Sequence, residues 1–135
     1  MTSQQKGEVA QLKVQVRAVE KGFIVARPTV DCRYDLIIDT GKKLLRAQVK
    51  YADGKSSHAA GAVLLGLRRW AGNDSSRWRV YTGMEVDLLL VYVAKVNKVV
   101  ALSPSDFSGR SSLCLRYTPP KIKQPSVRLV DDFVW

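Results

Sequence analysis

The sequence contains few of the residues on which many metal-binding domains depend. Its 135 residues include a single histidine, His58, and two cysteines, Cys32 and Cys114. One histidine excludes the paired-histidine nuclease motifs, and two distant cysteines form neither a CxxC pair nor a Cys/His cluster that could hold zinc. We therefore expect both cysteines to be free thiols.

Long apolar runs and acidic residues are also scarce. A membrane-spanning helix needs roughly 20 apolar residues, whereas the richest stretch here, Leu88 to Ala94, ends at Lys95. The N-terminus has no apolar signal core, so we expect a soluble, cytoplasmic protein without a membrane partner. Asp and Glu number 12 against 22 Lys and Arg, which gives a formal net charge of +10. This charge indicates a polyanionic partner; charge alone favours nucleic acid only modestly over an anionic membrane surface.

The remaining composition predicts one domain of the α/β class. The length fits a single domain, and a hydrophobic content of 46% suffices for one core. Residues 6–21 contain no proline, and Val9, Leu12, Val16 and Val19 recur at three- and four-residue spacing, which predicts an amphipathic helix. Short β-branched or alternating runs predict strands at 23–25, 34–39, 44–51, 87–93, 98–102 and 113–117. We expect these elements to form one central sheet flanked by helices.

One predicted hairpin brings together residues suited to metal-dependent hydrolysis. Asp35 opens its first strand and Lys50 closes its second, so a turn near Gly41 places both at the same edge of the sheet. Gln48 and Lys50 are two positions apart and therefore share a strand face. A carboxylate, an amide oxygen and a main-chain carbonyl near Val49 are hard oxygen ligands suited to Mg²⁺. A neighbouring lysine can hold or deprotonate the attacking water.

Glu8, in the predicted helix, could add a second carboxylate, because Gly7 lets the backbone approach closely. Each of these residues also has a structural interpretation. Asp35 could cap a turn, Gln48 and Lys50 could form a solvated strand face, and Glu8 could be an ordinary acid in the first helical turn. Spacing alone leaves both interpretations open.

Several segments, taken in order, resemble a known nuclease superfamily. The stretches KGEVAQLKV, KGFIVARP, YDLIID and KLLRAQVK are similar to the PD-(D/E)xK nucleases, and in particular to the small branch that includes a cyanobacterial homing endonuclease of a transfer-RNA group I intron. DLLLVYV and VVALSPSDF are also typical of that branch. The resemblance implies a single restriction-endonuclease-like domain over residues 1–135, with a central mixed β-sheet.

The resemblance also implies the roles of individual residues. Glu8, Asp35, Gln48 and Lys50 take the catalytic positions, and Mg²⁺, or Mn²⁺ as a substitute, would be held by Glu8, Asp35, Gln48 and the main chain of Val49. Two departures are notable: Gln48 replaces an acidic residue, and Tyr34 replaces the proline before the Asp. The branch tolerates glutamine at this position, whereas a catalytically dead descendant is the alternative.

DNA contacts are predicted mainly from a segment at residues 53–79, which we interpret as an insertion. It is rich in arginine and tryptophan, and basic residues at turns lie near it in the sequence. Such residues can bind phosphates and enter a groove. Trp70 and Trp78 could equally be core residues. The predicted DNA-binding residues are Lys42, Lys43, Lys55, Arg68, Arg69, Arg77 and Arg79.

Together these features predict a sequence-specific endonuclease of the homing type that cuts double-stranded DNA with Mg²⁺. Cutting both strands requires two active sites, so we expect a homo-oligomer; the resemblance points to a tetramer, with a dimer as the alternative. A Holliday-junction resolvase and a non-catalytic DNA-binding module of the same fold are the competing functions. Pro119, Pro120 and Pro125 predict an extended C-terminal tail over residues 118–135.

Overall fold

The computed structural model describes residues 1–54, 60–70, 78–122 and 125–135. The first part of the chain forms a helix and three strands: α1 (Ser3–Glu20), β1 (Ile24–Ala26), β2 (Leu36–Asp39) and β3 (Leu44–Ala52). Three shorter strands follow: β4 (Ala62–Gly66), β5 (Arg68–Trp70) and β6 (Trp78–Val80). The rest of the chain forms β7 (Leu88–Val93), η1 (Ala94–Val96), β8 (Lys98–Leu102), α2 (Pro104–Phe107), β9 (Ser112–Arg116) and η2 (Val130–Asp132).

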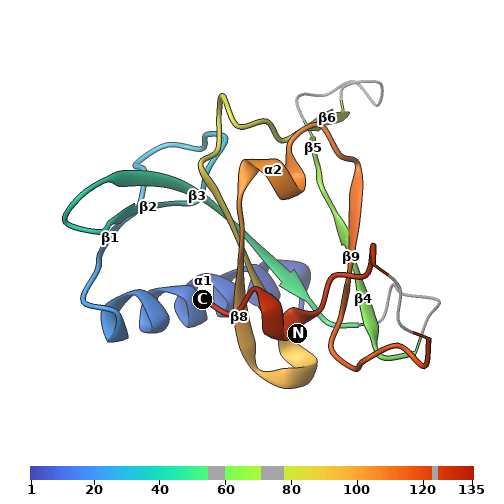
Figure 1. Cartoon of the computed structure of the whole chain (residues 1–135). Helices are drawn as coiled ribbons and strands as arrows, with labels where there is room; N and C mark the ends of the chain where they lie inside the picture. The colour runs from blue at the N-terminus through green and yellow to red at the C-terminus, as the bar shows by residue number, and fades with distance from the viewer. Residues whose placement is uncertain (55–59, 71–77, 123–124) are drawn as a thin grey trace.

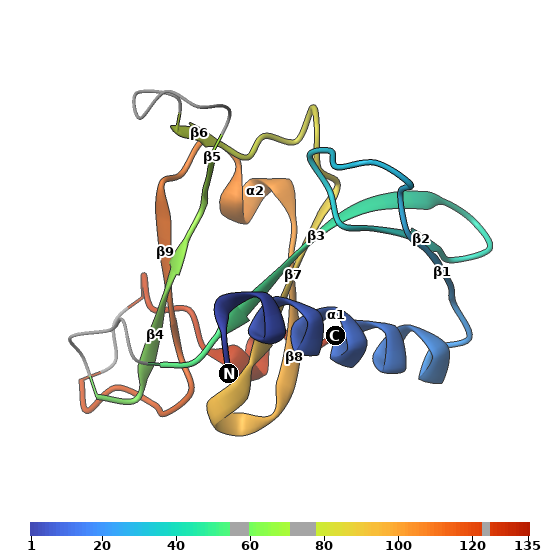
Figure 2. The ribbon, with the colours of Figure 1, turned by 180° about the vertical axis from the view of Figure 1, so that it is seen from behind.

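A five-stranded sheet in the order β1-β2-β3-β7-β8 forms the centre of the fold (Figure 1). β3 and β7 are parallel, and the other neighbouring strands are antiparallel. α1 packs along one face of this sheet, as the reverse view shows (Figure 2). The predicted α/β fold with a central mixed sheet is therefore confirmed.

The predicted helix is confirmed, but of its four predicted apolar positions only Val9 packs against the core. It starts at Ser3 because Thr2 forms a capping box with Gln5, and it stops at Gly22, which has a φ of 78°. The residues buried against the sheet are Ala10, Val14 and Ala18. The predicted contact residues Leu12, Val16 and Val19 are instead 51%, 56% and 69% exposed. Small side chains at a spacing of four let the helix approach the strands closely. This face of α1 therefore meets the sheet, and the face with Leu12, Val16 and Val19 does not.

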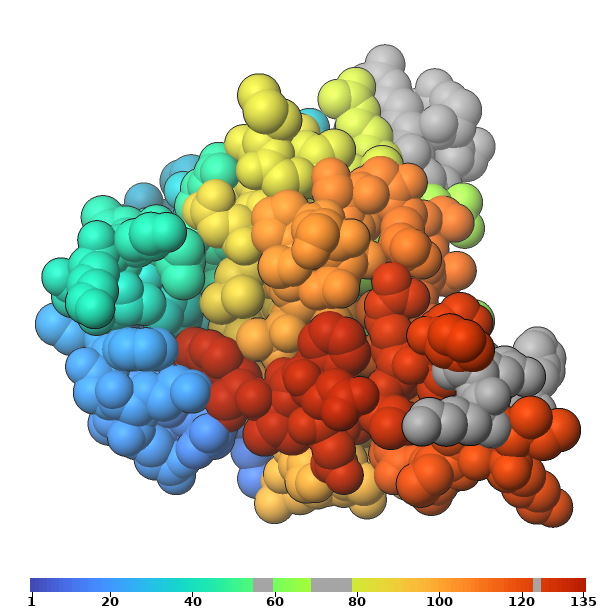
Figure 3. Space-filling model, in the orientation of Figure 1, coloured from blue at the N-terminus to red at the C-terminus, as the bar shows by residue number. Residues whose placement is uncertain are grey.

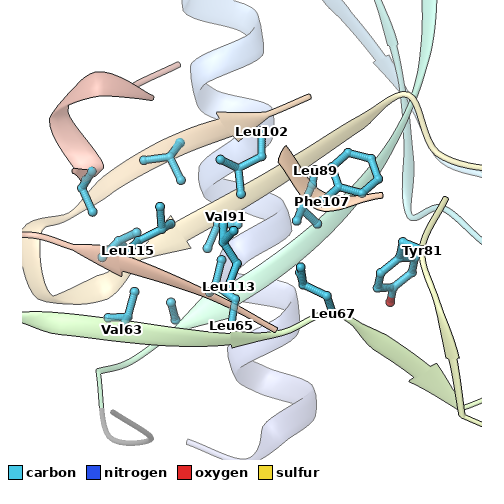
Figure 4. Close-up of a cluster of buried hydrophobic side chains, with 14 of the residues drawn as sticks. Val63, Leu65, Leu67, Tyr81, Leu89, Val91, Leu102, Phe107, Leu113 and Leu115 are labelled. Atoms are coloured by element: carbon cyan, nitrogen blue, oxygen red, sulfur yellow. The ribbon is translucent and has the colours of Figure 1, made fainter. Parts of the chain in front are cut away.

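Two hydrophobic clusters lie on the two faces of the central sheet. On one face, residues of α1 pack against inward-facing residues of β2, β3 and β7. On the other face, β4 and β9 form an antiparallel ribbon whose side chains meet those of β7 and β8 (Figure 4). β7 is central to both, because Leu89 and Val91 face the ribbon while Leu90 faces α1. The predicted hairpin of β7 and β8 is confirmed, with β8 at the sheet edge.

The segment at 53–79 contributes to the core as well as to the surface. Val63, Leu65 and Leu67 are buried, and β4 pairs with β9 along its length. The last predicted strand is therefore present as β9, but it belongs to this ribbon and not to the central sheet. Residues 53–61 show little alternation of apolar and polar residues, so the sequence did not predict strand β4, which follows them.

The C-terminal residues return to the central sheet, where they lie across the front of the molecule in Figure 3. The main-chain nitrogen of Trp135 donates to the carbonyl of Val99, and that of Ala101 donates to the carbonyl of Phe133. These bonds cover part of the edge of β8, which would otherwise expose unpaired main-chain groups. Cys32 and Cys114 are free thiols, as predicted. Within the described residues, no helix has the length and apolar character needed to span a membrane.

Candidate active site

The candidate site lies where β3 extends beyond its neighbour β2. β2 begins at Leu36, which pairs with Ala47, and the main-chain nitrogen of Asp35 donates to the carbonyl of Ala47 at 2.9 Å. β3 continues to Ala52. The side of β3 that faces β2 is therefore no longer paired with that strand from Gln48 onward, and Asp35 stands at the start of this open edge.

Asp35 and Gln48 are joined by a short hydrogen bond. Nε2 of Gln48 donates to Oδ2 of Asp35 at 2.7 Å, and the main-chain nitrogen of Val49 donates to the same oxygen at 2.9 Å. Nε2 of Gln48 also lies 3.4 Å from the carbonyl oxygen of Val49. The three predicted metal-binding groups of this hairpin are therefore contiguous, and the amide nitrogen of Gln48 contacts oxygens of both Asp35 and Val49.

The chemistry of these groups fits a divalent cation. A carboxylate, an amide oxygen and a main-chain carbonyl are the kinds of ligand that Mg²⁺ and Mn²⁺ accept. To share a cation with Asp35 and Val49, the Gln48 side chain would have to move out from between their oxygens and present Oε1, the acceptor end of its amide. Among the described residues, no group of three or more His, Cys, Asp or Glu side chains is close enough to hold a metal. Asp35 would therefore be the main source of negative charge at the centre.

Lys50 lies on the same face of β3 as Gln48 and is partly buried. Burial lowers the pKa of the Lys50 ammonium, and the nearby Asp35 carboxylate opposes this effect to a smaller extent. Nζ lies 5.1 Å from the ring centroid of Tyr81, a buried residue, at a distance typical of a cation–π contact. A lowered pKa increases the fraction of Lys50 that is neutral, and only the neutral amine can accept a proton from water.

Glu8 does not join this cluster. Its carboxylate pairs with the guanidinium of Arg27 at 2.9 Å, and the two side chains are about half exposed. Gln11, one turn further along α1, instead lines a pocket of about 250 Å³ together with Asp35 and Arg27. The sequence gave no sign of Arg27 as the partner of Glu8, because the two residues meet only after the chain turns from α1 into β1.

Arg46 and Asp87 form a second polar contact that the sequence analysis missed. Arg46 Nη2 donates to Asp87 Oδ1 and Arg46 Nε to Asp87 Oδ2, each at 2.9 Å, and the main-chain nitrogen of Arg46 donates to Oδ2 at 2.8 Å. The guanidinium of Arg46 holds the pKa of the Asp87 carboxyl below its usual value. This pair fixes the start of β7 against β3 and so stabilises the strand that carries Gln48 and Lys50.

Of the predicted DNA-binding residues that the structure describes, Lys42 and Lys43 lie at the far end of β3 from Lys50. Lys42 and Lys43 are exposed at the turn between β2 and β3. Lys43 is seven positions before Lys50, which corresponds to roughly 23 Å of strand. Arg68 and Arg79 are exposed on β5 and β6, and Arg69 is the register partner of Arg79. Lys55 and Arg77 lie outside the described residues.

Known proteins resemble this chain in fold and sequence. A solved structure of a bacterial homing endonuclease, I-Ssp6803I, matches with a TM-score of 0.74 and 26% sequence identity, over 98% of this chain and 86% of that one. No curated protein matches the chain significantly. The family model for PD-(D/E)XK endonuclease matches residues 1–135. The chain therefore belongs to the PD-(D/E)XK endonuclease family.

Proposed function

We propose that the protein is a Mg²⁺-dependent endonuclease of the homing type, which cuts both strands of a DNA duplex at a specific sequence. Membership of an endonuclease family and the likeness to a homing endonuclease support DNA cleavage. The observation that carries the metal-dependent mechanism is the contact of Asp35 with Gln48 and Val49 beside the partly buried Lys50. The net charge of +10 suits a DNA partner. The proposed place of action is the cytoplasm.

In this proposal, Asp35, Gln48 Oε1 and the carbonyl oxygen of Val49 hold the metal, with Mn²⁺ as a substitute for Mg²⁺. A bound divalent cation would polarise the phosphate and lower the pKa of a water molecule. Lys50 holds the attacking water or takes its proton at Nζ, and its charged form stabilises the negative charge that develops on the phosphate. Tyr81 orients the ammonium of Lys50 through the face of its ring.

Glu8 remains part of the proposed metal site. Both side chains of its ion pair with Arg27 are about half exposed to solvent. Exposed ion pairs contribute only about 0–1 kcal/mol to stability. Releasing Glu8 from Arg27 therefore costs little free energy. The Glu8 carboxylate would then supply the second negative charge that the cluster around Asp35 lacks.

A cleavage assay on a supercoiled plasmid carrying candidate target sites and on a four-way junction, each with and without Mg²⁺, tests the proposed function. Linear plasmid that appears only with Mg²⁺ supports a double-strand endonuclease. Cleavage restricted to the junction would replace the proposal with a Holliday-junction resolvase. DNA binding without cleavage at any Mg²⁺ or Mn²⁺ concentration would indicate a non-catalytic DNA-binding module. That alternative arises because Gln48 stands where the family has an acidic residue.

We also propose that the protein acts as a homo-oligomer, a tetramer or otherwise a dimer, because each chain would supply one catalytic site and a duplex has two strands. Light scattering on the purified protein measures its mass directly. Mixing wild-type chains with an excess of Lys50→Ala chains gives a functional readout. Mixed oligomers should nick one strand and accumulate open-circular plasmid, whereas independent monomers would still produce linear plasmid at a rate set by the wild-type concentration.

A further inference from the structure

Two pockets adjoin the catalytic residues, one at Asp35 and one at Lys50, and each contains one basic side chain besides Lys50 itself. The first, of about 250 Å³, is lined by Asp35 together with Arg27. The second, of about 370 Å³, is lined by Lys50 and Val49 together with Lys6 and Gly7. The catalytic hairpin thus has a cation on its Asp35 side and another on its Lys50 side.

We propose that Arg27 and Lys6 bind the two DNA backbone phosphates that flank the phosphate to be cleaved. The inference rests on the proposed function, since it assigns a place to the DNA strand at that same site. A phosphate in each pocket would leave the phosphate between them next to Asp35 and Lys50. Arg27 and Lys6 would then be positioning residues that hold the strand without touching the reacting atoms.

Each of the two cations is paired with a carboxylate that a phosphate can replace. Arg27 pairs with Glu8 at 2.9 Å, and Nζ of Lys6 pairs with Asp53 at 2.7 Å. All four side chains are partly exposed to solvent, so a phosphate can reach both cations. The bond to Asp53 raises the pKa of Lys6, which keeps its ammonium charged. Exchange of a carboxylate for a phosphate therefore preserves the charge pairing of both cations.

Gly7, in the lining of the second pocket, provides an independent reason to place a DNA strand along this part of α1. It lies inside α1, where glycine is less favourable than alanine by about 1 kcal/mol. The fold does not require glycine there, because a Cβ added at Gly7 would meet no atom within 4 Å. An exposed, bare helix surface between Lys6 and Glu8 is what a closely approaching DNA backbone needs.

Binding measured against salt concentration tests the two phosphate contacts. Fluorescence anisotropy with a labelled duplex of about 30 base pairs in EDTA reports backbone binding without cleavage. Lys6→Ala and Arg27→Ala should each reduce the slope of log affinity against log salt by about one unit. Lys13→Ala and Lys98→Ala are the controls: Lys13 lies on the same helix over the ring of Tyr92, and Lys98 is ion-paired at the distant edge of the sheet. Both controls should leave the slope unchanged.

Two further variants separate phosphate binding from a purely structural role. Asp53→Asn removes the competing carboxylate from Lys6 and should tighten DNA binding, whereas Asp131→Asn, which releases Lys98, should not. Gly7→Leu should raise the melting temperature, because leucine is the better helix former, and should weaken binding and cleavage by obstructing the strand. A variant that is more stable than wild type and yet binds DNA more weakly has not lost binding through unfolding.

The outcomes distinguish this inference from the proposed function. Unchanged salt slopes in Lys6→Ala and Arg27→Ala, with normal cleavage by the wild type, would overturn the placement of the strand alone. Equal binding by wild type and Gly7→Leu would do the same. A wild-type protein that binds no duplex overturns both. Melting temperatures of every variant, measured alongside, show whether each one is folded.

Discussion

The amide nitrogen of Gln48 lies 2.7 Å from Oδ2 of Asp35, and this contact defines the centre of the candidate site. A glutamate at position 48 would place a second carboxylate against Asp35, with repulsion between them. The neutral amide instead donates a hydrogen bond to the Asp35 carboxylate. Its opposite end is an oxygen that could bind a metal once the side chain moves. Glutamine can therefore stabilise the metal-free protein and still serve as a ligand.

Gln48→Glu should make stability more dependent on the metal. Without Mg²⁺ the variant loses a hydrogen bond to a charged group, worth about 1.5–3 kcal/mol, and gains a like-charge contact that raises a carboxyl pKa. The loss should be greatest near neutral pH and shrink as the pH falls through that raised pKa, where one carboxyl becomes protonated. With Mg²⁺, thermal unfolding should show a larger rise in melting temperature than wild type shows. Equal shifts in both proteins would argue against a metal ligand at position 48.

Asp35→Ala and Lys50→Ala should abolish magnesium-dependent strand cleavage. Removal of one group that stabilises transition-state charge costs about 10²–10³-fold in rate, and loss of the main metal ligand should cost more. DNA affinity in EDTA should remain within about threefold of wild type, since neither residue supplies most of the phosphate contacts. Cleavage rates and anisotropy measured on the same preparations check both statements. Wild-type rates in these variants would refute the site assignment.

Lys50→Met should stabilise the protein while inactivating it. Burial lowers the pKa of Lys50 from its usual value of 10.5, so the charged form of this partly buried side chain costs free energy in the folded protein. Methionine removes that cost, and each 1 kcal/mol gained in the free energy of unfolding should raise the melting temperature by roughly 3–6 °C.

The pH dependence of that stabilisation provides the check. Between the lowered pKa and 10.5, unfolded wild-type protein binds more protons at Lys50 than folded protein does, so wild-type stability rises with pH in this window. The advantage of Lys50→Met should therefore be largest below the lowered pKa and decline as the pH approaches 10.5. Thermal melts of both proteins from pH 7 to pH 10 measure it. An advantage that grows with pH would contradict burial as the cause.

Arg68→Ala and Arg79→Ala should weaken DNA binding, because both side chains are exposed on the β5–β6 hairpin. An arginine that reads a base should lose about 1–3 kcal/mol and relax the preference at that base pair. One that meets only a phosphate should lose affinity evenly over all sequences and reduce the salt slope by about one unit. Affinities on cognate and scrambled duplexes separate these cases. If neither variant differs from wild type, recognition lies elsewhere, with Lys42, Lys43 and Lys121 the next residues to replace.

The sequence by itself determined the local elements and the hairpin that carries the candidate site. Alternation along Leu44–Ala52 is a property of neighbouring residues, and a strand of period two must place Gln48 and Lys50 on one face. The turn near Gly41 then brings Asp35 to the same edge, because antiparallel pairing fixes which ends of two strands meet. Local periodicity and turn chemistry suffice for such conclusions.

Only the tertiary structure decided which face of α1 is buried and which groups meet across the chain. Ala10, Val14 and Ala18 contact the sheet because close approach requires small side chains, whereas hydrophobicity alone favoured Leu12 and Val16. The pairing of β4 with β9 and of Arg27 with Glu8 joins residues far apart in sequence. Such contacts depend on the packing of whole layers, and no local pattern encodes them.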